Sequence, residues 1–178
     1  DLARLSNTSS TPGVFEATLV AQRATKSMLS GTTTEFWSYN NDVPGPLIDV
    51  FEGDTVRIRL DNRLSQETTV HWHGLPVPPA QDGNPMDPIA PGASRTYEFT
   101  LPVGSAGTYW YHPHPHEMTA EQVFRGMAGL PIVRSRTDPV PAAIEEKLLV
   151  ISDLRLAADG TIPANTPMDW QTGREGNY

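Results

Sequence analysis

The sequence predicts an all-β protein, built as a sandwich or a barrel. Short runs of residues alternate between apolar and polar side chains, which is the pattern of strands with one buried face. Turn residues separate these runs, and the chain holds 14 Gly and 17 Pro among its 178 residues. Many short strands at this spacing favour a sandwich or a barrel. A chain of this length holds one hydrophobic core, with some residues to spare.

The first four predicted strands lie in the N-terminal third of the chain. The clearest is 55–60, where Val56, Ile58 and Leu60 share one face, opposite two arginines. Each of the others alternates or runs directly into a turn rich in Gly, Pro or Asp. In chain order these strands cover residues 14–20, 34–39, 47–51 and 55–60.

Four further strands are expected between residues 68 and 134. The run at 94–101 places Tyr97, Phe99 and Leu101 on one side, and a proline-rich loop precedes it. In chain order the later strands cover residues 68–73, 94–101, 107–112 and 130–134.

One short helix is expected after the last histidine. Thr119-Ala120-Glu121-Gln122 fits a capping box with Thr119 as N-cap and Gln122 at N3, and the helix ends by about Arg125, before Gly126. Beyond it, residues 137–141 are a proline-punctuated linker, 147–156 a further strand, and the remainder loop. A single strand cannot close a core. We therefore expect a first domain over residues 1–137, and a linker and the opening segment of an incomplete second domain over 138–178.

Composition excludes several classes of function. The formal net charge of -8 argues against nucleic acid or an anionic membrane as partner, and no apolar run approaches the roughly 18 residues that cross a bilayer. The chain has no cysteine, which excludes a disulfide, a Cys nucleophile and a thiolate ligand from within it. The chain begins at Asp1 rather than Met, and we interpret this as a removed leader or a trimmed sequence.

All five histidines fall in two clusters, His71-Trp72-His73-Gly74 and His112-Pro113-His114-Pro115-His116. On a strand, residues i and i+2 share a face about 7 Å apart at Cα, so each pair projects together. Neutral imidazole is the commonest metal ligand, and His71, His73, His112 and His114 therefore predict a polynuclear metal site. His116 has no partner motif, and an exposed or supporting role fits it as well as ligation does. All-imidazole ligation fits copper, zinc, nickel or iron.

The residues around the histidines resemble the first domain of multicopper oxidases, in particular bacterial three-domain enzymes of the laccase and copper-efflux oxidase type. The resemblance covers about residues 14–178. It implies a cupredoxin-like Greek-key β-sandwich. The strings that carry it are His71-Trp72-His73-Gly74, Gly107-Thr108-Tyr109-Trp110-Tyr111-His112-Pro113-His114, Gln122-Val123-Phe124-Arg125-Gly126-Met127-Ala128-Gly129, Pro44-Gly45-Pro46 and Glu52-Gly53-Asp54.

The same resemblance implies roles for individual residues in a trinuclear copper cluster. His71 would bind the type 2 copper, His73 and His112 would share one type 3 copper, and His114 would bind the other. Asp82 matches an acidic residue that supplies protons during oxygen reduction, although an Asp-Gly turn explains it equally well.

Other features of the sequence depart from the family or leave alternatives open. The family's His-x-x-His-x-His and His-Cys-His signatures are absent, and with them the type 1 copper and half of the cluster. Glu117 stands where relatives often have glycine, and Trp72 and Trp110 suit packing on a buried β face. Residues 168–176 resemble the start of the family's second domain, so we expect a fragment of a longer enzyme.

The resulting hypothesis is the first domain of a periplasmic or secreted multicopper oxidase. Such an enzyme takes electrons singly from a phenolic or metal-ion donor and reduces dioxygen to water, together with its remaining cupredoxin domains, which hold the type 1 copper. This chain alone would be inactive. One alternative is a stand-alone copper storage or delivery module. Another is a mononuclear zinc hydrolase with Glu117 or Asp82 as base.

Overall fold

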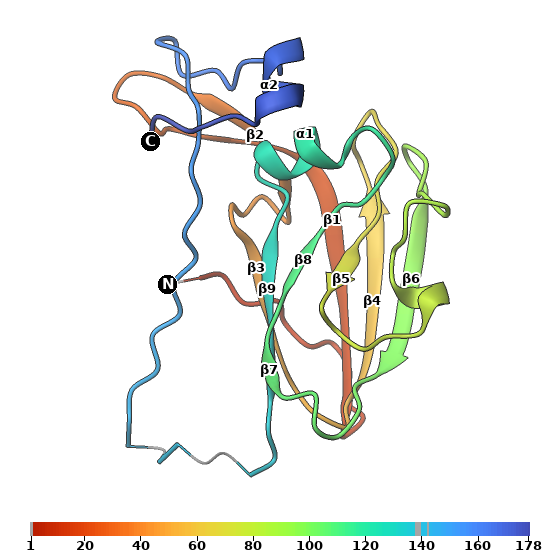
Figure 1. Cartoon of the computed structure of the whole chain (residues 1–178). Coiled ribbons are helices and arrows are strands. Elements are labelled where there is room, and N and C mark those ends of the chain that lie inside the picture. Colours follow the sequence, from red (N-terminus) through yellow and green to blue (C-terminus); the bar gives the residue numbers. More distant parts are fainter. Residues whose placement is uncertain (1, 138–139, 142) are drawn as a thin grey trace.

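The strands form two sheets that face each other (Figure 1). The computed structural model describes residues 2–137, 140–141 and 143–178. The first sheet has four strands in the order β2-β1-β4-β6, and only the β1–β4 pair in it is parallel. Its members are β1 (Val14–Lys26), β2 (Thr34–Tyr39), β4 (Thr55–Asn62) and β6 (Ser94–Thr100).

The second sheet has five strands and carries both histidine clusters. Its order is β3-β9-β8-β5, and β7 pairs with β9. The predicted strand at 107–112 is split at Tyr109, and the one at 68–73 is shortened to its last three residues. The members are β3 (Gly45–Phe51), β5 (His71–His73), β7 (Gly107–Thr108), β8 (Trp110–His112) and β9 (Gly129–Arg134).

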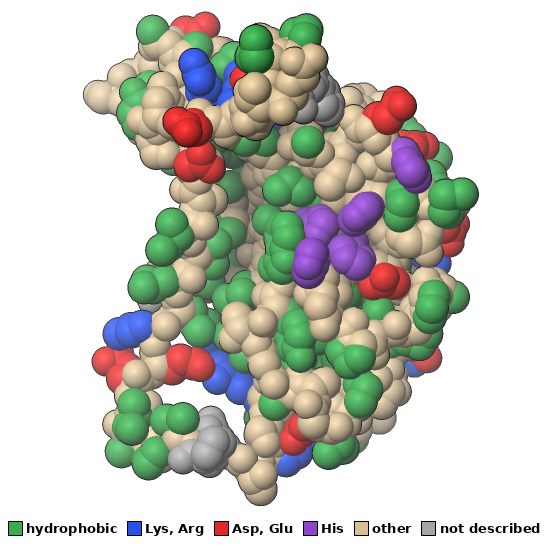
Figure 2. Space-filling model, in the orientation of Figure 1, with side chains coloured by type: hydrophobic (Ala, Val, Ile, Leu, Met, Phe, Trp, Pro, Cys, Tyr) green, Lys and Arg blue, Asp and Glu red, His purple; other side chains and the backbone are tan. Residues whose placement is uncertain are grey.

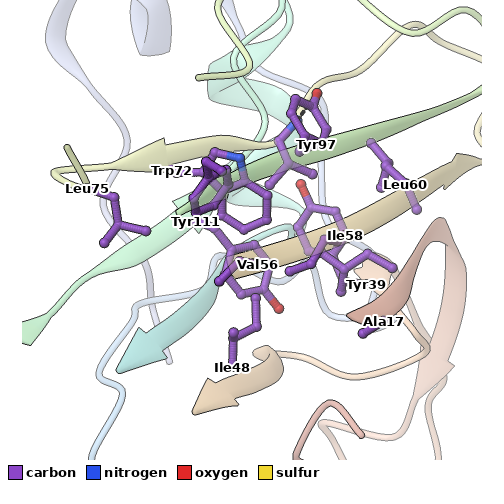
Figure 3. Packing of buried hydrophobic residues seen from close by; sticks show 14 of the residues in the cluster. Ala17, Tyr39, Ile48, Val56, Ile58, Leu60, Trp72, Leu75, Tyr97 and Tyr111 are labelled. Atoms are coloured by element: carbon purple, nitrogen blue, oxygen red, sulfur yellow. Dashed lines mark hydrogen bonds between the residues drawn. The ribbon is translucent and has the colours of Figure 1, made fainter. Parts of the chain in front are cut away.

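The hydrophobic core lies between the two sheets (Figure 3). Trp72 and Tyr111, from β5 and β8, are 1% and 0% exposed. The ring of Trp72 packs edge-on against Tyr97 and Phe99 of β6, at centroid distances of 5.7 and 5.4 Å. Because side chains alternate along a strand, burial of Trp72 and Tyr111 turns their neighbours to the outer face. The predicted sandwich is confirmed, and so is the packing role of Trp72.

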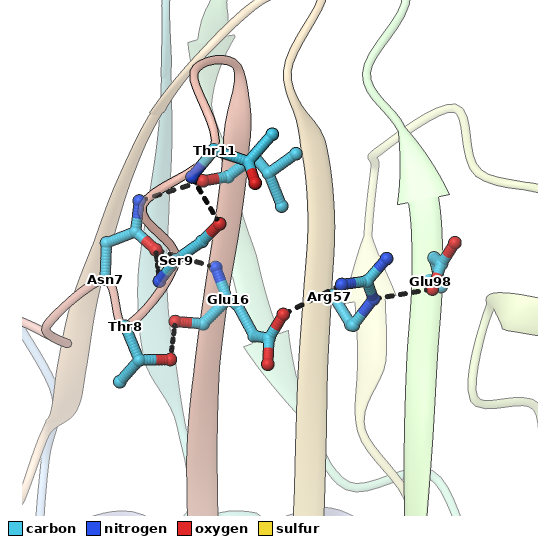
Figure 4. Close-up of polar contacts among 8 residues, drawn as sticks. Asn7, Thr8, Ser9, Thr11, Glu16, Arg57 and Glu98 are labelled. Atoms are coloured by element: carbon cyan, nitrogen blue, oxygen red, sulfur yellow. Dashed lines mark hydrogen bonds and ion pairs between the residues drawn. The ribbon is translucent and has the colours of Figure 1, made fainter.

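The outer face of the first sheet is a charged, exposed surface (Figure 4). Arg57 on β4 donates to Glu16 on β1 and to Glu98 on β6, at 2.8 and 2.7 Å. The N-terminal segment lies beside this face, and the Thr8 amide donates to the Glu16 carbonyl at 2.7 Å. The amide of Leu5 donates to Leu47 on β3, so this segment links the two sheets along one side.

The predicted helix is confirmed as α1 (Thr119–Phe124), but the predicted capping box is wrong. The N-cap is Met118, which makes no side-chain cap, and the Thr119 hydroxyl instead donates to the Pro115 carbonyl at 2.8 Å. Gln122 is fully buried and bonds to residues before β5. The helix packs with Gln122 facing inward, and this prevents Gln122 from folding back to the helix N-terminus. In the described residues no helix has the length and apolarity needed to cross a membrane.

The C-terminal tail differs from prediction in two ways. Residues 147–156 form no strand, and Leu149 and Ile151 are 82% and 92% exposed. A strand needs a partner, and this extended stretch pairs with none of the described strands. The helix α2 (Pro167–Thr172) lies where a loop was predicted. The sequence carries a signal for the start of this helix, because Thr166 and Asp169 form a capping box and Pro167 stands at the first helical position.

The tail also packs on the first sheet. Leu156 and Ile162 form a small buried cluster with Phe36 of β2, and Thr34 donates to the Gly160 carbonyl at 2.7 Å. Residues 138 and 139 lie outside the described residues, and with them part of the predicted linker at 137–141 and the predicted domain boundary. The division into domains stays a prediction.

Glu117 adopts a backbone conformation that favours glycine, with φ of 60°. A residue with a Cβ in this left-handed region costs the folded state about 1–2 kcal/mol. Glycine avoids that cost, but it loses more conformational entropy on folding, which offsets part of the gain. We expect Glu117→Gly to raise the free energy of unfolding by about 0.5–1 kcal/mol, measured by urea denaturation. Glu117→Ala removes the charge but keeps Cβ, so it should give no such gain. Equal stability of the two variants would contradict this explanation.

Candidate metal centre

Pairing of β5 with β8 brings the two histidine clusters together. In this antiparallel pair, His71 lies opposite His112 and Trp72 lies opposite Tyr111. Since Trp72 and Tyr111 face the core, His71, His73 and His112 share the outer face. Figure 2 shows histidine side chains gathered on this face.

All four predicted ligands lie close together. From the His71 ring, the centroids of His73, His112 and His114 are 5.4, 5.2 and 5.2 Å away. Possible ligand atoms of His71, His73 and His112 all lie within 4.8 Å of one another. His114 lies just beyond the end of β8. His116 is exposed, and within the described part of the chain it makes no ring contact with the other histidines.

Backbone carbonyls orient two of the four rings. His71 Nδ1 lies 2.9 Å from the Asp82 carbonyl oxygen, and His112 Nδ1 lies 2.7 Å from that of Pro113. A carbonyl only accepts, so each Nδ1 carries the proton and each Nε2 keeps its lone pair for a metal. Burial lowers the pKa of His112 to about 4, against the opposing effect of the Pro113 carbonyl. His112 is therefore neutral at pH 7 and available as a ligand.

The spacing of two ring nitrogens fits a shared metal ion. His73 Nδ1 and His112 Nε2 are 3.2 Å apart. Two nitrogens bound to one ion at about 2.0–2.1 Å with tetrahedral angles lie about 3.3 Å apart. His114 Nδ1 is buried and makes no hydrogen bond among the described residues, so no carbonyl orients this ring as one orients those of His71 and His112. These nitrogens fit a metal centre.

A short loop holds Asp82 beside His71. The 3-10 helix η1 (Pro79–Gln81) ends at Asp82, and Asp82 Oδ1 lies 3.2 Å from His71 Nδ1. Gly83 follows with φ of 65°, and a Cβ there would lie 1.8 Å from the Val70 carbonyl oxygen. The backbone of the loop therefore lies directly against the chain entering β5. Asp82 caps the C-terminal end of this 3-10 helix and also contacts a candidate ligand.

Two residues lock this loop to the other sheet. The Glu98 amide on β6 donates to Gln81 Oε1 at 2.9 Å, and Arg95 donates to the Ala80 carbonyl at 2.7 Å. The position of Asp82 is therefore set by β6 as well as by β5. Sequence reasoning missed both residues, because their partners lie 17 and 15 positions away along the chain.

The prediction that Trp110 packs on a buried face is wrong. Trp110 is 39% exposed, stacks on the His112 ring at a centroid distance of 3.9 Å, and lies 5.0 Å from the His73 ring. Its register partner on β5 is His73, which places it on the histidine face. The i, i+2 relation of Trp110 to His112 was the signal for this placement.

Comparison with known families decides the affiliation of this fold and site. The sequence profile described as "Multicopper oxidase" matches residues 20–138, which is more than half of the chain. The chain belongs to the multicopper oxidase family. Membership in the multicopper oxidases implies copper as the metal.

Individual relatives are longer proteins, and the chain matches only a part of each. It superimposes on the multicopper oxidase from Campylobacter jejuni, described as "a metallo-oxidase", with a TM-score of 0.95 and 47% identity, over 99% of this chain and 37% of that one. It is 41% identical to multicopper oxidase mco from Staphylococcus aureus, over 66% of this chain and 26% of that protein. It is 34% identical to cell division protein FtsP from Escherichia coli, over 84% of this chain and 33% of that protein.

These matches confirm an N-terminal cupredoxin domain of a multicopper oxidase, with the predicted cupredoxin-like sandwich. The chain spans about a third or less of the curated relatives it matches. The assignment of His71, His73, His112 and His114 to particular copper ions stays a prediction, as does proton supply by Asp82.

Proposed function

We propose that this chain supplies half the ligands of a trinuclear copper cluster at which a multicopper oxidase reduces dioxygen to water. His71 would bind the type 2 copper, His73 and His112 would share one type 3 copper, and His114 would bind the other. The observation that carries this proposal is the grouping of four imidazoles on one face, with His73 and His112 nitrogens 3.2 Å apart, in a chain of this family.

The protein's part in this chemistry is to position ligands and to deliver protons. When bound, copper supplies the electron transfer, in which four electrons and four protons convert one dioxygen into two waters. The carbonyls of Asp82 and Pro113 keep Nε2 of His71 and His112 free as ligands. The Asp82 carboxylate is one-third exposed and lies against His71, so it stands between solvent and the site, where a group that delivers protons would be needed.

The electron donor and the rest of the enzyme follow from the family. We propose a metal-ion or phenolic donor, and the metal ion is favoured because the Campylobacter jejuni relative is a metallo-oxidase. Electrons would enter at a type 1 copper, which needs a thiolate, in further cupredoxin domains of the same enzyme. A periplasmic or secreted location is part of the same proposal.

Copper content and oxygen uptake test this function. In the complete protein we expect four donor electrons consumed for each dioxygen, and His71→Ala and His114→Ala should each lower both the copper bound per chain and the oxygen uptake. The 178-residue chain alone should show no oxidase activity, since it has no cysteine for the type 1 copper. If both variants kept full copper and full activity, the ligand assignment would be wrong.

A second candidate function is a copper-holding module without turnover, which the absence of cysteine favours. It predicts that this chain binds copper stoichiometrically without a second polypeptide. The oxidase proposal instead predicts that tight binding requires the ligands of the remaining domains. Copper titration of the purified chain, followed by equilibrium dialysis, separates the two.

A further inference from the structure

The segment that carries His114 has a single backbone donor. Pro113 and Pro115 lack an N–H, so the His114 amide alone can anchor residues 113–115 through a backbone N–H. It donates to the Thr69 hydroxyl oxygen at 2.8 Å. Thr69 is fully buried and lies two residues before His71, so this bond joins the second histidine cluster to the first.

His114 differs from the oriented ligands in its ring contacts. His71 and His112 have Nδ1 held by carbonyl oxygens, whereas Nδ1 of His114 is buried and has no partner in the part of the chain that the structure describes. Ligating histidines usually donate the second nitrogen to an oriented acceptor, which fixes the ring. For His114 the backbone is fixed instead, by Thr69.

Other buried polar groups hold the segment that precedes β5 in place. Thr68 donates to Gln122 Oε1, and Gln122 Nε2 donates to the Glu67 carbonyl, both at 2.8 Å. Thr68 and Gln122 are fully buried, so they tie α1 to the chain just before Thr69. They make no hydrogen bond to His114 among the described residues.

We propose that Thr69 is the positioning residue for His114, setting where this ligand stands relative to His71. The inference rests on the proposed copper site and adds a residue to its support. The Thr69 hydroxyl accepts the one amide that residues 113–115 can offer, so its removal leaves that amide unpaired and frees the segment. Loss of an outer partner of a metal ligand typically weakens metal binding by about 10–100-fold.

Thr69→Val and Thr68→Val form a matched pair in the complete protein. Both remove a buried hydroxyl, but only Thr69 contacts His114. Hydrogen–deuterium exchange of the metal-free protein reads the anchor directly, because a peptide that spans residues 112–116 keeps only two backbone amides, those of His114 and His116. We expect faster exchange in this peptide and about 10–100-fold weaker copper binding for Thr69→Val. Thr69→Ser should behave as wild type, and Thr68→Val should keep wild-type exchange in this peptide and wild-type copper affinity.

Two results would overturn the proposal. One is a Thr69→Val variant with unchanged exchange and unchanged copper affinity. The other is a Thr68→Val variant whose exchange becomes as fast, and whose copper binding as weak, as in Thr69→Val. Thr69→Ala removes the same hydroxyl in a smaller side chain and carries the same expectation if the valine variant does not fold. Failure of wild-type protein to bind copper would sink the proposed function, while the exchange experiment would still decide whether Thr69 anchors His114.

Discussion

Replacing His73 by alanine is expected to remove a copper ion from the site. His73 Nδ1 lies 3.2 Å from His112 Nε2, a spacing that fits one ion between them, so the variant leaves that ion a single ligand from this chain. We expect copper affinity to fall by more than about 100-fold, since loss of an outer partner alone costs about 10–100-fold. Copper per chain, measured by atomic absorption after dialysis, checks this.

His116→Ala is the matched control for His73→Ala. Both histidines are exposed, so neither substitution opens a cavity in the core, and both variants should keep the wild-type free energy of unfolding to within about 0.5 kcal/mol. Only the His73 variant should lose copper. Equal copper content in the two variants would show that His73 is not a ligand.

Replacing Gly83 by alanine is expected to displace the loop that carries Asp82. The new Cβ would lie 1.8 Å from the Val70 carbonyl oxygen, far inside van der Waals contact, so the loop must move away from β5. The Asp82 carbonyl that holds His71 Nδ1 at 2.9 Å moves with it. We expect the free energy of unfolding to fall by about 3 kcal/mol from strain and overpacking. Copper affinity should fall by about 10–100-fold.

Gly92→Ala is the control that separates the steric clash of a new Cβ at position 83 from the strain of a positive φ. Gly92 has φ of 76°, close to that of Gly83, but a Cβ there meets nothing within 4 Å. This variant should lose only about 1 kcal/mol and bind copper normally, as followed by urea denaturation and copper titration. A Gly83→Ala variant that matched Gly92→Ala in both measurements would contradict the loop geometry.

The strands of the two sheets and the outward direction of His71 and His73 follow from local patterns, and those predictions hold. Alternation places Trp72 inward and His71 and His73 outward, because this depends only on neighbouring residues. The placement of Gln122 depends on where α1 docks, so a local capping pattern misassigned it. The stretch at 147–156 has the composition of a strand, but a strand forms only where another offers its hydrogen bonds.

Family resemblance added what local patterns could not. Spacing alone left copper, zinc, nickel and iron open, and membership in the multicopper oxidases favours copper. Neither spacing nor resemblance indicated Thr69, because its bond to His114 joins positions 45 residues apart. Trp110 was predicted on the core face, although its position two residues before His112 on the same strand predicts the histidine face.

The division of β5 and β8 into a core face and a histidine face separates two kinds of physical requirement on the sequence. Trp72 and Tyr111 are required for the packing of the sandwich. The neighbouring His71, His73 and His112 are required for the metal site. The exposed His73 can therefore be exchanged without disturbing the core. A sequence without these histidines would keep the packing of Trp72 and Tyr111, and the same scaffold could then present a different set of side chains on this face.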